Sequence, residues 1–272
     1  MKKFFILFLI IFLTFPSLAS AMSIGGAETQ GRGKFGVGLD SEFVLKREFR
    51  ERNFINALPQ NVTYKNEIEA YNTLRETLKI SYGIIDNLDI YVKVGLETEP
   101  TYRENIDAFF VGAAAIHGIS KLRGKNALVY GLGLKGTYPL PYDWLIGCDT
   151  QYFRYSTRYR SSGGYDTAGA ITGNVVLGTI TYSEWHIAPY IAKKFGNFTP
   201  YIGAKYSQSE LRDKIDSQGD IIVFAQGAKY YSLYNVGAFG GLDVNLGEHW
   251  RLNLEGRFID ETAASLGVNY KF

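Results

Sequence analysis

The chain has 272 residues and a formal net charge of +2, from 29 Lys and Arg against 27 Asp and Glu. This near balance gives no basic signal for nucleic-acid binding and no acidic signal for a calcium-binding repeat. Cys148 is the only cysteine, which excludes a disulfide framework and a thiolate metal site. The sequence indicates no cofactor and no metal.

The first 21 residues are predicted to be a cleaved signal peptide. Lys2 and Lys3 precede an apolar run over residues 4–15, which is too short to remain in a membrane as an anchor. Ala19 and Ala21 then give the A-x-A pattern at which signal peptides are cut. Cleavage would remove two lysines and leave residues 22–272 as one exported domain with 27 basic and 27 acidic residues.

From residue 33 onward, apolar and polar residues alternate with the period of a β-strand. In residues 88–96, apolar Leu and Ile or Val side chains fall on the even positions, while Asp89 and Lys93 fall on the odd ones. The pattern predicts ten strands, at about 33–45, 68–82, 88–97, 127–138, 144–155, 181–194, 199–211, 234–246, 250–260 and 262–272.

Alternation alone would also fit a soluble β-sandwich. Segment length, charges of both signs in mid-strand, and connections that alternate between tight and long favour a barrel that spans a membrane. The tight turns would face the periplasm, near residues 85–87, 139–143, 196–198 and 247–249. The long outer loops would cover residues 46–66, 97–125, 156–178 and 212–232.

Segment 106–119 ("IDAFFVGAAAIHGI") is apolar enough to be another strand. A single extra strand would reverse every later loop, and bacterial single-chain barrels have even strand numbers. We therefore predict that this segment lies in the second outer loop, as a short helix or a hairpin. The strand number stays open between eight and twelve, with twelve if this region supplies two strands.

The stretch "GLGLKG" (131–136) has the spacing of a dinucleotide-binding fingerprint. Pro139 and Pro141 prevent the helix that would have to follow it, so a nucleotide site is not predicted. Gly131 and Gly133 are predicted to face a crowded lumen, where a missing side chain leaves room for a long neighbour.

The chain ends on "NYKF", a strand that terminates on an aromatic residue. Together with the signal peptide and the strand–turn–strand unit over 183–207, this end resembles the small outer-membrane β-barrel proteins of the OmpA, OmpX and opacity kind. The resemblance implies an all-β, antiparallel transmembrane barrel in the outer membrane of a Gram-negative cell, with Phe272 and Tyr270 as its insertion signal. The implied partners are outer-membrane lipid and lipopolysaccharide, the barrel assembly machinery and periplasmic chaperones, with no nucleic acid, and the implied state is a monomer.

The predicted lumen lining mixes both charges and should interlock into ion pairs that leave no wide pore. Its members are Asp40, Glu42, Arg75, Lys79, Asp89, Lys93, Lys135, Asp149, Glu184, Lys205, Asp243, Arg251, Glu255 and Arg257. We therefore expect a structural or surface-interaction protein that works through its outer loops and is not an enzyme. The alternative is a narrow channel for small hydrophilic solutes or ions.

A less favoured hypothesis is a barrel hydrolase that uses His186 and Glu184. Both residues are predicted to face the lumen from one strand, and a carboxylate beside an imidazole can orient a general base. The sequence shows no nucleophile placed with them. A structural hydrogen-bond network is the favoured interpretation of the pair.

Overall fold

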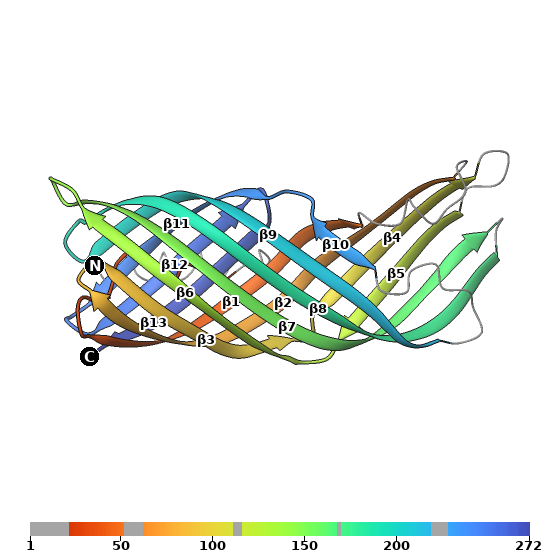
Figure 1. The fold of residues 1–272 in the computed structure, drawn as a ribbon, viewed down its shortest axis with the longest axis horizontal. Coiled ribbons are helices and arrows are strands. Elements are labelled where there is room, and N and C mark those ends of the chain that lie inside the picture. Colours follow the sequence, from red (N-terminus) through yellow and green to blue (C-terminus); the bar gives the residue numbers. More distant parts are fainter. Residues whose placement is uncertain (1–21, 52–61, 111–115, 168–169, 219–227) are drawn as a thin grey trace, which may run out of the picture.

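The computed structural model describes residues 22–51, 62–110, 116–167, 170–218 and 228–272. In these ranges the chain forms one antiparallel sheet of 13 strands, which closes into a long barrel (Figure 1). No helix in the described ranges is long and apolar enough to cross a membrane. The predicted signal peptide, with Ala19 and Ala21, lies outside the described residues.

The strands are β1 (Phe35–Glu51), β2 (Val62–Ile85), β3 (Leu88–Thr98), β4 (Thr101–Phe110), β5 (Ile116–Gly124), β6 (Ala127–Pro139), β7 (Trp144–Thr167), β8 (Ala170–Lys193), β9 (Phe198–Gln218), β10 (Lys229–Ser232), β11 (Val236–Leu246), β12 (Trp250–Phe258) and β13 (Thr262–Lys271).

Ten of these strands form a closed ring that carries the membrane-facing surface. Its order is β1–β2–β3–β6–β7–β8–β9–β11–β12–β13, and β13 pairs with β1 to close it. The predicted ten-stranded antiparallel barrel is therefore confirmed. The four predicted tight turns join β2 to β3, β6 to β7, β8 to β9 and β11 to β12, as expected for turns that share the periplasmic end.

Beyond the ten-stranded ring, the described strands continue as a narrower ring of eight, which we call the outer wall. β4 pairs with β2 and β5, and β5 pairs with β7, so β4 and β5 take over from β3 and β6. On the opposite side, β10 bridges β9 and β1 above the shorter β12–β13 hairpin. Figure 1 shows β4, β5 and the ends of β7 and β8 projecting from the barrel at the end away from the C-terminus.

A row of backbone irregularities separates the two rings on one side of the barrel. β1 has a register shift between Val44 and Lys46. On neighbouring strands, Asn72 has a φ of 50° and Glu99, between β3 and β4, has a φ of 39°. The break between β5 and β6 lies beside them at residues 125–126. Such interruptions shift the side-chain alternation of a strand by one residue.

The outward and inward faces exchange character at this boundary. In the ten-stranded ring the outward face is apolar, with Leu39, Leu132 and Ile202 each more than half exposed. Its inward face is polar, and every predicted lumen residue is buried except the half-buried Arg251, which confirms the predicted lining. In the outer wall most inward side chains are apolar or aromatic, with a few polar groups such as Asn66 among them, and most outward side chains are polar or charged.

The predicted outer loops were therefore wrong in extent. Large parts of segments 46–66, 97–125, 156–178 and 212–232 lie in paired strands of the outer wall. A wall that stands in water buries its apolar residues inside and exposes its charges. The sequence interpretation expected apolar side chains on the lipid face, so it took the reversed pattern for loop.

Segment 106–119 takes the second of its two predicted forms, a pair of antiparallel strands and not a short helix. Its described residues belong to β4 and β5, where Ile106 pairs with Gly118 across an antiparallel ladder. The two strands add to the outer wall and not to the ten-stranded ring, which explains how an extra apolar hairpin leaves the predicted parity intact. Residues 111–115 lie outside the described residues.

Gly133 shows why the glycine-rich strand β6 needs glycine. A Cβ placed there would meet the Tyr91 hydroxyl oxygen at 2.4 Å and its ring carbon at 2.3 Å. The Tyr91 ring occupies the space, and its hydroxyl donates to Asp149 at 2.8 Å. The prediction that this glycine admits a long lumenal neighbour is confirmed.

Candidate functional site

The described N-terminal segment, residues 22–30, lies inside the lumen of the ten-stranded ring. Met22, Ser23, Ile24 and Ala27 are all at least 98% buried, although the segment belongs to no strand. We call this segment the plug. Sequence analysis did not predict it.

Lumenal lysines and carboxylates hold the plug by its main chain. Lys93 donates to the carbonyl of Ser23 at 2.8 Å, and Lys135 donates to the carbonyls of Ile24 and Gly26. Three plug amides donate to carboxylates of the barrel: Ser23 to Glu42 at 3.0 Å, Ala27 to Asp243 at 2.8 Å and Gln30 to Asp89 at 2.9 Å. The plug therefore supplies the acceptors that the buried lysines need and the donors that the buried carboxylates need.

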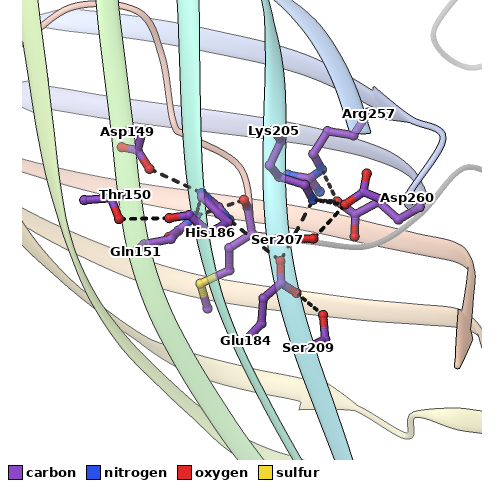
Figure 2. A network of polar contacts seen from close by, with 12 residues as sticks. Asp149, Thr150, Gln151, Glu184, His186, Lys205, Ser207, Ser209, Arg257 and Asp260 are labelled. Atoms are coloured by element: carbon purple, nitrogen blue, oxygen red, sulfur yellow. Dashed lines mark hydrogen bonds and ion pairs between the residues drawn. The ribbon is translucent and has the colours of Figure 1, made fainter. Parts of the chain in front are cut away.

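His186 lies above the plug and contacts two carboxylates. Its Nε2 is 3.5 Å from Asp149, and its Nδ1 is 3.7 Å from Glu184. Gln151 lies between this ring and the plug, since its Nε2 is 3.1 Å from His186 Nε2 and 2.9 Å from the Met22 carbonyl. Figure 2 shows the imidazole between Asp149 and Glu184. The predicted pairing of His186 and Glu184 in the lumen is confirmed.

Glu184 connects His186 to a second, larger group of buried charges. Arg47 is 2.5 Å from Glu184 and 3.0 Å from Glu261. Lys205 is 2.8 Å from Asp260 and also contacts Glu261. Asp260 and Glu261 lie in the connection from β12 to β13 and are both buried, so this turn closes over the barrel interior. Figure 2 shows Asp260 pointing toward Lys205 and Ser207.

The serine hydroxyls nearest to Glu184 are bonded to groups other than His186. The hydroxyls of Ser207 and Ser209 interact with Asp260, Arg47, Glu184 and Ser232. Among the described residues no serine hydroxyl bonds to the His186 ring, which is itself fully buried. The described geometry therefore supports a structural network, as sequence analysis favoured.

An aromatic layer fills the lumen above the charges. The Phe153 and Tyr182 ring centroids are 5.5 Å apart, and the Tyr102 and Tyr155 hydroxyls are 2.8 Å apart. Arg75 stacks over the Phe153 ring at 4.6 Å, which couples the layer to the ion pairs below it. Plug, ion pairs and aromatic layer thus occupy three successive levels of the described lumen.

Two carboxylates meet near the outer end of the wall, above the aromatic layer. Glu51 and Glu104 each accept a hydrogen bond from Asn66 Nδ2 at 3.1 Å, so the bonded oxygens are no more than twice that distance apart. Tyr230 donates to Glu104 at 2.9 Å. Burial raises the pKa of both carboxyl groups, and Glu104 raises the pKa of Glu51 further.

We expect this pair to make the outer wall more stable as the pH falls. A carboxyl whose pKa is raised by folding binds protons more tightly in the folded state, so stability increases as the pH falls through the raised pKa. Glu104→Gln keeps the acceptor for Tyr230 and removes the charge. At pH 8 the variant should unfold at a higher urea concentration than the parent, and the two should converge near pH 4. A parent–variant difference that does not change with pH would contradict this account.

The predicted insertion signal lies at the periplasmic end of the barrel. Phe272 donates its amide to the carbonyl of Phe35 at 2.9 Å, and its ring lies 4.9 Å from the Tyr270 ring. Tyr270 also packs on Trp250. These contacts place both side chains in the aromatic rim, while their role in insertion stays a prediction.

Comparison with known proteins supports the fold. No family model and no curated protein sequence matches the chain. Among solved structures, the outer-membrane protease OmpT from Escherichia coli matches with a TM-score of 0.56 and 9% identity over 92% of this chain and 100% of that one. The translocator domain of the autotransporter NalP from Neisseria meningitidis matches with a TM-score of 0.44 and 11% identity, over 89% of each chain.

One expectation is corrected by these matches. Sequence analysis expected a barrel that is not an enzyme, whereas a barrel of the same fold is a protease. That expectation was wrong because an outer-membrane barrel supports enzymes as well as channels, so fold alone does not name the activity. The matches do not bear on the narrower resemblance to the OmpA, OmpX and opacity kind. The chain therefore has the fold of an outer-membrane β-barrel.

Proposed function

We propose that this barrel is a surface-interaction protein that acts through its outer wall. The observation that carries the proposal is the exchange of faces at the membrane boundary. Strands such as β2 and β7, each of 24 residues, are far longer than the 9–11 residues or so that cross a bilayer. The excess forms a wall with its own apolar interior and a charged exterior, which is the construction of a folded domain in water.

The filled lumen counts against the alternative of a narrow channel. A solute entering from the periplasm would meet the plug first, then the buried charges around Arg47, then the aromatic layer. Buried cations such as Arg47, Lys93 and Lys205 are held by carboxylates, and separating such pairs without replacement is costly. We expect planar-bilayer recordings of the intact barrel to show no steady conductance.

The test removes the outer wall and keeps the membrane ring. The register offers four places to cut, each at a directly opposed or neighbouring residue pair: Val44 with Thr73, Glu97 with Ala127, Tyr155 with Tyr182, and Ser207 with Asn235. Short Asn-Gly turns would join each pair. Cells that carry the full barrel should aggregate in dense suspension and adhere to a lawn of cells that lack it, and cells with the trimmed barrel should not.

Two controls keep this test decisive. The trimmed barrel must still migrate differently with and without heating on a denaturing gel, which shows that the ring has inserted and folded. A trimmed, inserted barrel that supports the same aggregation as the full one would refute the proposal, as would a steady conductance through the intact protein.

A further inference from the structure

The charges on the exterior of the barrel above the membrane are distributed unevenly. On β1, β2 and β9 the outward cations stand beside carboxylates. Lys46 is 2.7 Å from Glu48, while Arg50 and Lys65 are 2.7 and 2.8 Å from Glu67. Arg212 likewise contacts Glu210. On this part of the surface the positive charges are therefore paired with neighbouring negative ones.

The neighbouring face, on β5 and β7, carries exposed cations without such partners. We call this set the basic strip; its members are Lys121, Arg123, Lys125, Arg154, Arg158 and Arg160. Among the described residues none of the six has a carboxylate within ion-pair distance. The strip therefore concentrates five positive charges on two adjacent strands and a sixth, Lys125, directly after the end of β5.

The register makes the like charges direct neighbours. Arg123 stands opposite Arg160 across the β5–β7 ladder, and the Lys125 amide donates to the Arg158 carbonyl at 2.9 Å. Like charges placed directly opposite each other destabilise a sheet. An anion bound between them would reverse that effect, and Arg side chains bind phosphate oxygens through paired N–H donors.

The strip begins where the apolar band ends. On β7, Arg154 follows the lipid-facing Tyr152 by one outward position, and it stands opposite Tyr130 of β6. Leu128, the next outward residue of β6 toward the outer wall, is 59% exposed. Tyrosine at the end of an apolar band marks the membrane interface. The cations thus start at the depth of the headgroups of the outer leaflet.

We propose that the basic strip binds the phosphate groups of a phosphorylated glycolipid in the outer leaflet. Arg123, Arg158 and Arg160 hold the phosphates, and the apolar band below them packs against the acyl chains. The charge complementarity and the continuity with the band both point to a membrane lipid. The three arginines belong to the lowest part of the outer wall, so the trimmed barrel would lose them too. Point substitutions that leave the wall in place therefore test the lipid site separately from the surface role.

The test measures binding of a fluorescent bisphosphorylated lipid A to the full-length mature barrel in detergent micelles. The strip variant is Arg123→Gln/Arg158→Gln/Arg160→Gln. The matched control is Lys46→Gln/Arg50→Gln/Lys65→Gln, which removes the same number of charges from the paired part of the exterior. We expect the strip variant to bind about tenfold more weakly or worse, which is about 1.4 kcal/mol, and the control to stay close to the parent.

Two further arms identify the ligand chemistry. Dephosphorylated lipid A should bind the parent about tenfold more weakly, by the same conversion, and millimolar inorganic phosphate should not displace the bisphosphorylated lipid. Equal losses in the strip variant and the control would show attraction to bulk charge and refute the site. Equal binding of the dephosphorylated lipid, or displacement by inorganic phosphate alone, would refute it as well. A change in the heat-modified gel migration of either variant identifies misfolding. In that case single Arg123→Gln and Arg160→Gln variants replace the triple variant, and each is expected to lose part of the affinity for the bisphosphorylated lipid.

Discussion

Deletion of residues 22–30 is expected to open the periplasmic half of the lumen to water-soluble reagents while the middle of the lumen stays closed. Ser81 is a lumen residue that is 3% exposed. It lies beside Gln30 of the plug, since a Cβ placed at Gly36 would be 2.7 Å from both side chains. Ser209 is fully buried farther up, where it contacts Ser232. We therefore expect the burial of Ser81, but not that of Ser209, to depend on the plug.

The measurement uses single cysteines in a Cys148→Ser background. With the plug present, a membrane-impermeant maleimide should label neither Ser81→Cys nor Ser209→Cys. Without the plug it should label Ser81→Cys to completion and still spare Ser209→Cys. Labelling of Ser81→Cys in the intact barrel would show that the plug does not seal the lumen. Labelling of both cysteines after deletion would show that the ion pairs above the plug do not seal the lumen either.

Replacement of Arg47 by Ala should cost far more stability than replacement of Arg50 on the same strand. The Arg47 side chain is 1% exposed and bridges Glu184 and Glu261, whereas that of Arg50 is 49% exposed and pairs with Glu67. Removing one partner of a buried pair leaves the other charge unpaired and costs about 3–5 kcal/mol. An exposed pair contributes about 0–1 kcal/mol.

Urea unfolding of the refolded barrel in micelles gives the two free energies from midpoint and slope. Arg47→Lys serves as a third variant in case Arg47→Ala does not refold. It keeps the charge and loses the planar fork that reaches two carboxylates at once, so its loss should lie between the other two. Similar losses for Arg47→Ala and Arg50→Ala would mean that the mid-lumen charges are hydrated and not sealed.

The strands that cross the membrane were predictable because lipid imposes a strict rule on them. One face must be apolar along its whole length, so residues such as Asp40 and Lys93 could be assigned to the lumen from parity alone. The pairing of His186 with Glu184 followed from the same parity. The contact of His186 with Asp149 could not be predicted, because it depends on the register between β7 and β8, which the sequence pattern does not give.

The outer wall and the plug escaped prediction for different reasons. In the membrane ring the apolar side chains of β1 point outward, whereas beyond residue 45 the apolar Phe49 points inward and the charged Arg50 points outward. The same alternation therefore indicates opposite faces in the two parts of the strand. The plug is held through its carbonyls and amides, which are the same in every residue type and leave no side-chain signature. The one available signal was Lys79, Lys93 and Lys135, gathered on adjacent strands in one half of the lumen.

The end of the β12–β13 hairpin, beyond which β10 pairs directly with β1, gives the barrel the form of a bottle with a neck. Ten strands surround the interior in the membrane, and eight surround it in the outer wall. An eight-stranded interior is about as wide as the side chains that fill it, so trimming aromatic residues there would create closed cavities before it created a passage. The width of the neck depends on where the β12–β13 hairpin ends, at Phe258 and Thr262. A longer β12–β13 hairpin would separate β10 from β1 and add two strands to the wall, so the length of this one turn sets the width of the neck above a lumen that the plug and the ion pairs fill.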